Sequence, residues 1–188
     1  LFIAPEAHIL LVDDNELNLV VAKELLKPLR MQIDTAENGL QAVKMVRGSQ
    51  YDLVLMDHMM PVMDGIEAAK AIRALPEDKY QKLPIIALTA NAMVDARKEF
   101  LNAGMNGFVA KPIDFARICN QLKLWLPKDL VRDVPKEEAK KLLADDLSDR
   151  EIQPEDPQMG FSFEEGVKHC GSKAALMKTI RIFYRTID

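Results

Sequence analysis

Short apolar runs alternate five times with amphipathic segments of helical length, and this alternation restricts the fold of residues 1–126 more than any other feature. The runs are His8–Val12, Met31–Thr35, Asp52–Met56, Pro84–Leu88 and Gly107–Ala110. Runs of four or five residues suit strands that are buried on both faces of a parallel sheet. The predicted helices are Glu16–Leu29, Gly39–Val46, Asp64–Leu75, Asn91–Ala103 and Asp114–Leu126. The pattern therefore predicts an α/β domain with a five-stranded, parallel, doubly wound sheet and helices on both faces.

The texture changes after residue 126. Residues 127–160 carry 10 Asp+Glu against 6 Lys+Arg, a net charge of −4, and include four prolines, so we interpret them as a charged linker. Residues 161–188 again have a helical pattern, with Leu176, Ile180 and Phe183 on one face. This C-terminal helical extension must bury that face. By itself the segment should be poorly folded, because this face lacks its partner helices; the alternatives are packing on the preceding domain or on a second copy of the chain, which would make a dimer.

Composition argues against several functional classes. The whole chain has a net charge of −4, so everything outside 127–160 sums to zero, and no basic patch suggests nucleic-acid binding. No apolar run approaches the ~18 residues of a membrane span, and the start lacks the charges of a signal peptide. Cys119 and Cys170 lack metal-binding spacing and favour reduced thiols. We expect a cytoplasmic segment without direct membrane contact. Because it opens on Leu1, we expect it to belong to a longer protein, which is compatible with a membrane anchor elsewhere.

Polar residues follow four of the five predicted strands. Asp13 and Asp14 follow the first strand, Asp57 the third, Thr89 the fourth and Lys111 the fifth. Ligands of open α/β sheets bind outside the carboxyl ends of the strands, so we expect these five side chains to converge at one edge. Each residue alone would be an ordinary turn or surface residue, but a hydrophobic sheet has no structural need for the whole set.

The residue types in this set point to phosphoryl transfer. Three clustered carboxylates repel one another unless a cation lies among them. Oxygen ligands favour Mg²⁺, which keeps several waters and so leaves a position for a phosphoryl oxygen. Lys111 adds a positive charge and Thr89 a hydrogen-bond donor. Such groups stabilise the charge that develops on phosphoryl oxygens, so we predict a site that handles a phosphoryl group.

Four segments carry a resemblance to a known family: ILLVDDNELN, DLVLMDHMMPVMDGIEA, PIIALTANA and GFVAKPID. Together they resemble the receiver domain of response regulators and hybrid sensor histidine kinases, over residues 8–126. The resemblance implies the flavodoxin-like form of the predicted fold, with Asp57 as the phosphoacceptor. It also implies that Asp13, Asp14, Asp57 and the backbone carbonyl of Met59 hold Mg²⁺.

The same resemblance assigns roles around the acidic residues. It implies that Thr89 and Lys111 bind the phosphoryl oxygens and that Thr89 and Phe108 form the conformational switch. It further implies a cis peptide bond between Lys111 and Pro112, an isomer that proline makes accessible. Pro61 and Gly65 are expected to shape the loop after Asp57.

Two flanking segments resemble other parts of hybrid kinases. The opening FIAPEAHILLVDDN resembles the junction after an ATP-binding domain, and residues 161–188 resemble the beginning of a histidine phosphotransfer domain. In that family the reactive histidine lies on a later helix within an H-x-L-K-G motif. His169 is followed by CGSK, so we predict that it is not phosphorylated. The expected organisation is a receiver at 1–126, a linker at 127–160 and the helical segment at 161–188.

We therefore predict a phosphorelay receiver that takes a phosphoryl group from a histidine kinase or phosphotransfer domain onto Asp57 and then changes conformation. The segment would catalyse only its own phosphorylation and dephosphorylation, within a parent histidine kinase. One alternative is a phosphatase with an aspartate nucleophile. Such enzymes carry a second Asp two positions later as the general acid, where this chain has Met59. The other alternative is an unphosphorylated binding module, which the complete set of site residues disfavours.

Overall fold

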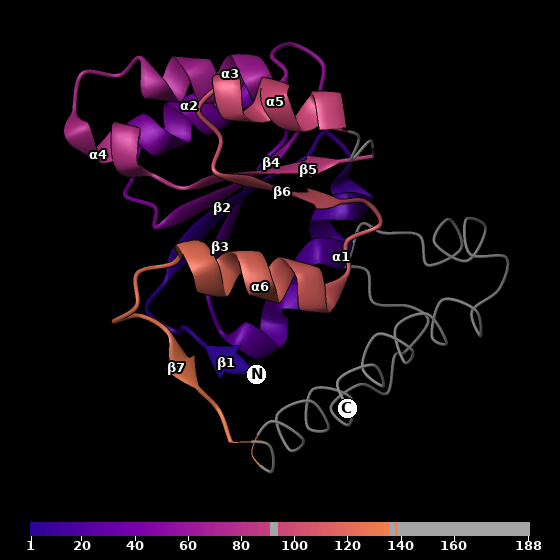
Figure 1. Ribbon diagram of the computed structural model, residues 1–188, viewed down its shortest axis with the longest axis vertical. Helices are drawn as coiled ribbons and strands as arrows, with labels where there is room; N and C mark the ends of the chain where they lie inside the picture. The colour runs from indigo at the N-terminus through magenta and orange to yellow at the C-terminus, as the bar shows by residue number, and fades with distance from the viewer. Residues whose placement is uncertain (91–93, 136–137, 139–188) are drawn as a thin grey trace, which may run out of the picture. The chain divides into compact units, whose positions relative to one another are not determined.

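A parallel five-stranded sheet organises the chain, as the computed structural model in Figure 1 shows; the structure describes residues 1–90, 94–135 and 138. The strands are β2 (His8–Val12), β3 (Gln32–Ala36), β4 (Leu53–Asp57), β5 (Ile85–Thr89) and β6 (Gly107–Ala110). Their order is β3-β2-β4-β5-β6, and all four pairings are parallel. The predicted doubly wound α/β fold is confirmed, with each strand within one residue of its expected bounds.

Helices connect the strands as the sequence predicts, with two differences. They are α1 (Glu16–Leu26), α2 (Gly39–Gly48), α3 (Gly65–Arg73), α4 (Asp78–Lys82), α5 (Val94–Asn102) and α6 (Phe115–Trp125). The first helix does not run as one α-helix to Leu29. Its last residues form a 3₁₀ turn, η1 (Lys27–Leu29), around Pro28, which lacks the N–H that an α-helix interior needs. The short α4 was not predicted, because five residues carry too little periodicity to detect.

The two faces of the sheet build separate cores. Successive strand residues point to opposite faces, so Leu10 and Val12 enter one core while Ile9 and Leu11 enter the other. The first core is closed by α2, α3 and α5, with Tyr80 of α4. The second is closed by α1 and α6 (Figure 1). Helices therefore cover both faces of the sheet, so a ligand can bind only at its edge, beyond the carboxyl ends of the strands.

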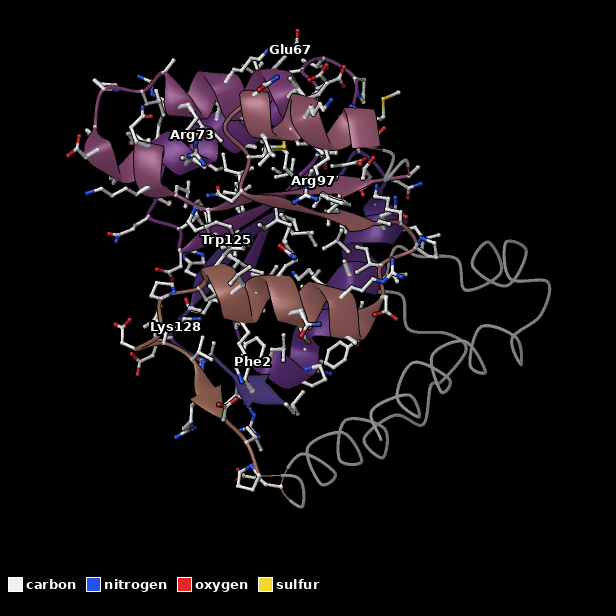
Figure 2. The ribbon with its side chains drawn as sticks, viewed as in Figure 1. Phe2, Glu67, Arg73, Arg97, Trp125 and Lys128 are labelled. Atoms are coloured by element: carbon white, nitrogen blue, oxygen red, sulfur yellow. The ribbon has the colours of Figure 1, made fainter. Side chains whose placement is uncertain are left out.

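A two-stranded antiparallel sheet that the sequence did not predict lies beside the second core. β1 (Phe2–Ile3) pairs with β7 (Arg132–Asp133), and Phe2, labelled in Figure 2, is 3% exposed. Lys123 of α6 forms an ion pair with Asp133. These contacts extend the compact unit over Leu1–Asp133. The predicted linker lies mostly, and the predicted 161–188 segment wholly, outside the described residues.

Arg73 joins the elements of the first core through its partly buried guanidinium group (Figure 2). Its Nε donates to the carbonyl of Gly104 at 2.9 Å, and Nη2 donates to the carbonyl of Leu83 at 2.7 Å and to Oδ1 of Asn106 at 3.1 Å. Its Nη1 also donates to the carbonyl of Tyr80. One side chain of α3 thereby fixes α4 and the loop before β6.

Across the described residues, we find no helix with both the length and the apolar character that a membrane crossing requires.

Candidate functional site

The carboxyl ends of β2 and β4 bring three carboxylates together. Asp57 is the last residue of β4, and Asp13 and Asp14 follow β2, which is hydrogen-bonded to β4. One oxygen of each carboxylate lies within 4.8 Å of the others. Asp13 and Asp57 are buried, with exposed fractions of 2% and 5%, while Asp14 is exposed. Two buried negative charges and one at the surface thus share a single small volume.

Lys111 supplies the positive charge of this site from the end of β6. Its Nζ lies 2.6 Å from Oδ2 of Asp13 and 3.0 Å from Oδ1 of Asp57, so one ammonium bridges two carboxylates. The following Lys111–Pro112 peptide bond is cis. The backbone N–H of Lys111 donates to the carbonyl of Thr89 at 2.7 Å, which fixes the start of this loop against β5.

The pKa values of the site reflect this crowding. Burial is the largest influence on the Asp57 carboxyl and raises its pKa, and Asp13 raises it further, while Lys111 and the His58 N–H act in the opposite direction. For Lys111, burial alone would lower the pKa, but the hydrogen bonds and charges of Asp13 and Asp57 outweigh it and raise the pKa. The lysine therefore stays protonated, and the cluster still holds more negative than positive charge.

The loop after Asp57 is fixed by backbone contacts. The N–H of Gly65 donates to the carbonyl of His58 at 3.1 Å, and a Cβ at Gly65 would collide with the carbonyl oxygen of Asp57. Glycine is therefore required for this close approach. At the loop apex the N–H of Met63 reaches the carbonyl of Pro61 at 2.8 Å across Val62, whose φ is +72°. The side chain of Met59 is 71% exposed beside the site and offers no proton to a reaction.

The two residues of the predicted switch lie at the β5–β6 side of the site. Thr89 is the last residue of β5, is 1% exposed and lies beside Ala110 of β6 in register. Phe108 is partly buried against the first core, and its ring centroid lies 6.5 Å from that of Phe100. Phe100 also meets the His58 ring edge-on, at 5.1 Å between centroids. A chain of rings thus connects the residue after Asp57 with Phe108, a feature that the sequence analysis missed.

The donor set fits a hard divalent cation. Asp13, Asp14 and Asp57 present only oxygen ligands, which Mg²⁺ prefers, and their negative charge exceeds what Lys111 neutralises. The cluster is reachable from solvent through the exposed Asp14. These residues can hold such an ion, together with a phosphoryl group that Lys111 could contact.

Comparison with known families supports this interpretation. Residues 9–123 match the family described as Response regulator receiver domain, which is more than half of the chain. The chain belongs to this family. Receiver domains are the phosphoryl-accepting modules of two-component signalling. The matched residues include all five strands of the parallel sheet, apart from His8 at the start of β2.

Parts of longer sensor and histidine-kinase proteins are similar to this receiver domain. It is 37% identical over 170 residues to the Sensor protein GacS of Pseudomonas syringae pv. syringae, covering 90% of the chain and 18% of that protein. It is 40% identical to Signal transduction histidine-protein kinase BarA of Escherichia coli K12 over 119 residues, covering 63% of the chain and 13% of that protein. The chain thus spans less than a fifth of these two curated relatives.

Among solved structures, the receiver domain of sensor histidine kinase PA1611 of Pseudomonas aeruginosa PAO1 is similar with a TM-score of 0.58 and 40% identity. The match covers 63% of this chain and 96% of that one, and that structure has a magnesium ion coordinated in its active-site cleft. The acidic cluster of Asp13, Asp14 and Asp57 is consistent with the same kind of site.

Proposed function

We propose that Asp57 of this receiver accepts a phosphoryl group from a phosphohistidine, with Mg²⁺ held by Asp13, Asp14, Asp57 and the backbone carbonyl of Met59. One observation carries the proposal: Lys111 Nζ bridges Asp13 and Asp57, at 2.6 and 3.0 Å, within a cluster of three carboxylates. This arrangement concentrates a nucleophile, a positive charge and a set of cation ligands at one point.

The reaction forms and breaks one bond to phosphorus in each half. A carboxylate oxygen of Asp57 attacks the phosphorus, the P–N bond of the donor breaks, and its electron pair remains on the imidazole nitrogen. The product is an acyl phosphate. Water later attacks the phosphorus, the P–O bond to Asp57 breaks, and inorganic phosphate leaves. When bound, the cation would neutralise charge on the carboxylates and on the phosphoryl oxygens.

The protein residues prepare this attack. The β4 strand and the close contact of Gly65 hold Asp57 in place, so the side chain loses little orientational freedom when it reacts. Lys111 keeps its proton because two carboxylates raise its pKa, and its flexible side chain can exchange the oxygens of Asp13 and Asp57 for a phosphoryl oxygen. Thr89 adds a hydroxyl at the same edge. These groups stabilise the charge on the transferring phosphoryl group.

We propose Thr89 and Phe108 as the element that reports phosphorylation. Thr89 would move toward the phosphoryl group, and Phe108, which contacts Phe100 of α5, would move into the space that it leaves. Phe108 carries no hydroxyl, so an inward position leaves no buried donor unpaired. The edge strand β6 and α5 would then change together.

We propose a histidine kinase or a phosphotransfer domain as the partner, within a parent hybrid histidine kinase in the cytoplasm. The receiver of Ssk1 in complex with the histidine phosphotransfer protein Ypd1 of Saccharomyces cerevisiae is similar, with a TM-score of 0.59 and 27% identity, over 65% of this chain and 90% of that one. The GacS match covers 90% of the chain and so extends beyond the compact unit that ends at Asp133. This supports the proposal that residues 161–188 begin a further domain of such a kinase.

Incubation with acetyl phosphate and Mg²⁺, followed by mass spectrometry, tests the proposal. We expect one phosphoryl group, sensitive to hydroxylamine, at Asp57. Asp57→Asn and EDTA should each abolish it. Asp34→Asn is the matched control, because it makes the same substitution in a different acidic group, and it should label like the wild type. Equal labelling of Asp57→Asn would refute the assignment.

A further inference from the structure

Asn18 holds the carboxylate of Asp13 from the first turn of α1, a contact outside the roles assigned above. Its Nδ2 donates to Oδ1 of Asp13 at 2.9 Å, and the backbone N–H of Asn15 donates to the same oxygen at 3.0 Å. The other oxygen, Oδ2, accepts a hydrogen bond from Lys111 Nζ at 2.6 Å. Each oxygen of this buried carboxylate therefore has its own set of donors.

This division assigns different tasks to the two oxygens. Oδ1 is occupied by two N–H donors of the α1 start, which do not take part in the reaction. Oδ2 accepts from the ammonium of Lys111, which also lies 3.0 Å from Oδ1 of Asp57. If Lys111 turns to a phosphoryl group, Oδ2 loses its partner, and only Asn15 and Asn18 continue to orient the carboxylate.

The α1 start is a firm support for this orientation. Asn15 caps the helix, because its Oδ1 accepts the N–H of Leu17 at 2.9 Å, and this fixes its own backbone N–H. Leu19 and Ala22 anchor the same helix in the second core. Asn18 thus donates from a rigid element, and its neutral amide satisfies Oδ1 without adding charge to the cluster.

We propose that Asn18 is a positioning residue of the phosphorylation site, which aims Oδ2 of Asp13 at the cation and leaves Lys111 free to change partners. The inference rests on the proposed function and adds to it a residue that acts through Asp13. Groups that hydrogen-bond metal-ligating carboxylates typically change metal affinity by about 10- to 100-fold when they are removed.

The test compares Asn18→Ala with Asn18→Gln, which keeps an amide donor, and with Asn120→Ala, an exposed asparagine within α6. Calorimetry gives the Mg²⁺ dissociation constant, and thermal unfolding in EDTA gives the stability of the metal-free protein. We expect Asn18→Ala to weaken Mg²⁺ binding about tenfold, with a Tm that matches the Asn120→Ala control. Asn18→Gln should recover most of the affinity.

Unchanged Mg²⁺ affinity in Asn18→Ala would overturn the inference. So would equal weakening in both Asn18 variants together with a lower Tm, because that result indicates a structural role alone. Labelling by acetyl phosphate separates this failure from a failure of the proposed function. A wild type that does not label at Asp57 refutes the function, whereas labelling with the same Mg²⁺ dependence in wild type and Asn18→Ala refutes only the role of Asn18.

Discussion

Two acidic groups of this domain show how differently the same residue type can be used. At the carboxyl edge, Asp57 shares one lysine with Asp13 and has Asp14 nearby. In β3, Oδ2 of Asp34 accepts hydrogen bonds from the hydroxyl of Tyr51 at 2.8 Å and from Nε2 of His8, the first residue of β2, at 3.0 Å. In the Asp57 group three carboxylates share one ammonium, so negative charge is in excess. In the Asp34 group the carboxylate, the Tyr51 hydroxyl and the His8 ring each have a hydrogen-bond partner.

The pKa directions of the two aspartates are opposite for this reason. Burial raises the pKa of Asp57, because its donors do not compensate for lost hydration. The Tyr51 hydrogen bond is the largest influence on Asp34 and lowers its pKa, with His8 acting in the same direction. Burial and the same contact raise the pKa of Tyr51 to about 12. The Asp57 cluster, whose charge is not balanced, is suited to bind a cation, whereas the hydrogen-bonded Asp34 group contributes to the stability of the fold.

The largest effect should come from removing the only cation that the described residues bring to the first group. Lys111→Ala takes away the charge that stabilises the transferring phosphoryl group, and we expect labelling by acetyl phosphate about 10²-fold slower, or roughly 2.7 kcal/mol. Rapid-quench labelling at saturating Mg²⁺ measures it, with Lys123→Ala, in an exposed ion pair, as the control. A rate within threefold of wild type would show that the bridge to Asp57 is not catalytic.

Neutralising Asp57 should stabilise the metal-free fold. A group whose pKa is raised on folding contributes stability below its unfolded pKa and loses it as the pH rises through the folded pKa. The ionised Asp57 therefore weakens the fold at pH 7, and Asp57→Asn should be more stable by about 1 kcal/mol. Urea unfolding in EDTA should show this gain at pH 7 and its disappearance below the ordinary aspartate pKa of 3.8. A loss of stability at pH 7 would contradict the comparison.

The same substitution at Asp34 should have the opposite sign. A group whose pKa is lowered on folding contributes stability above its unfolded pKa and loses it as the pH falls through the folded pKa. Asp34→Asn should therefore be less stable at pH 7, with the difference vanishing in acid below the ordinary aspartate range. Because 45% of this side chain is exposed, we expect only about 0.5 kcal/mol. Parallel urea curves for both variants measure the contrast, and equal signs would remove it.

The smallest effect concerns the exposed Met59. Its thioether cannot orient a water molecule, so we expect slow hydrolysis of the acyl phosphate, and Met59→Asn should speed it about twofold, roughly 0.4 kcal/mol. Loss of label after removal of the phosphodonor gives the rate, and Val62→Asn, at the exposed apex of the same loop, is the control. A label that lasts as long as in the wild type would leave Met59 without this role. The family resemblance also implies that Asn91, two positions after Thr89, flanks the same water molecule; this residue lies outside the described residues.

Much of the fold was determined by local pattern. Strands buried on both faces and amphipathic helices leave different periods in the sequence, so β2–β6 and the principal helices could be predicted. Strand ends are then known, and parallel strands place their carboxyl ends at one edge. The sequence alone therefore predicts that Asp13, Asp14, Asp57, Thr89 and Lys111 lie at that edge.

Other features depend on contacts between distant residues and leave no local pattern. β1 and β7 are two residues each and exist only because Phe2 pairs with Asp133 across the domain. Three contacts depend on the directions in which side chains point. They are the ion pairs of Lys111 with two carboxylates, the ring contacts from His58 to Phe108 and the hydrogen bond from Asn18 to Asp13. Their distances run from 2.6 Å between atoms to 6.5 Å between ring centroids. The sequence by itself determined which chemical groups share an edge, because periodicity is local; only tertiary packing decided which atom of each group faces which partner.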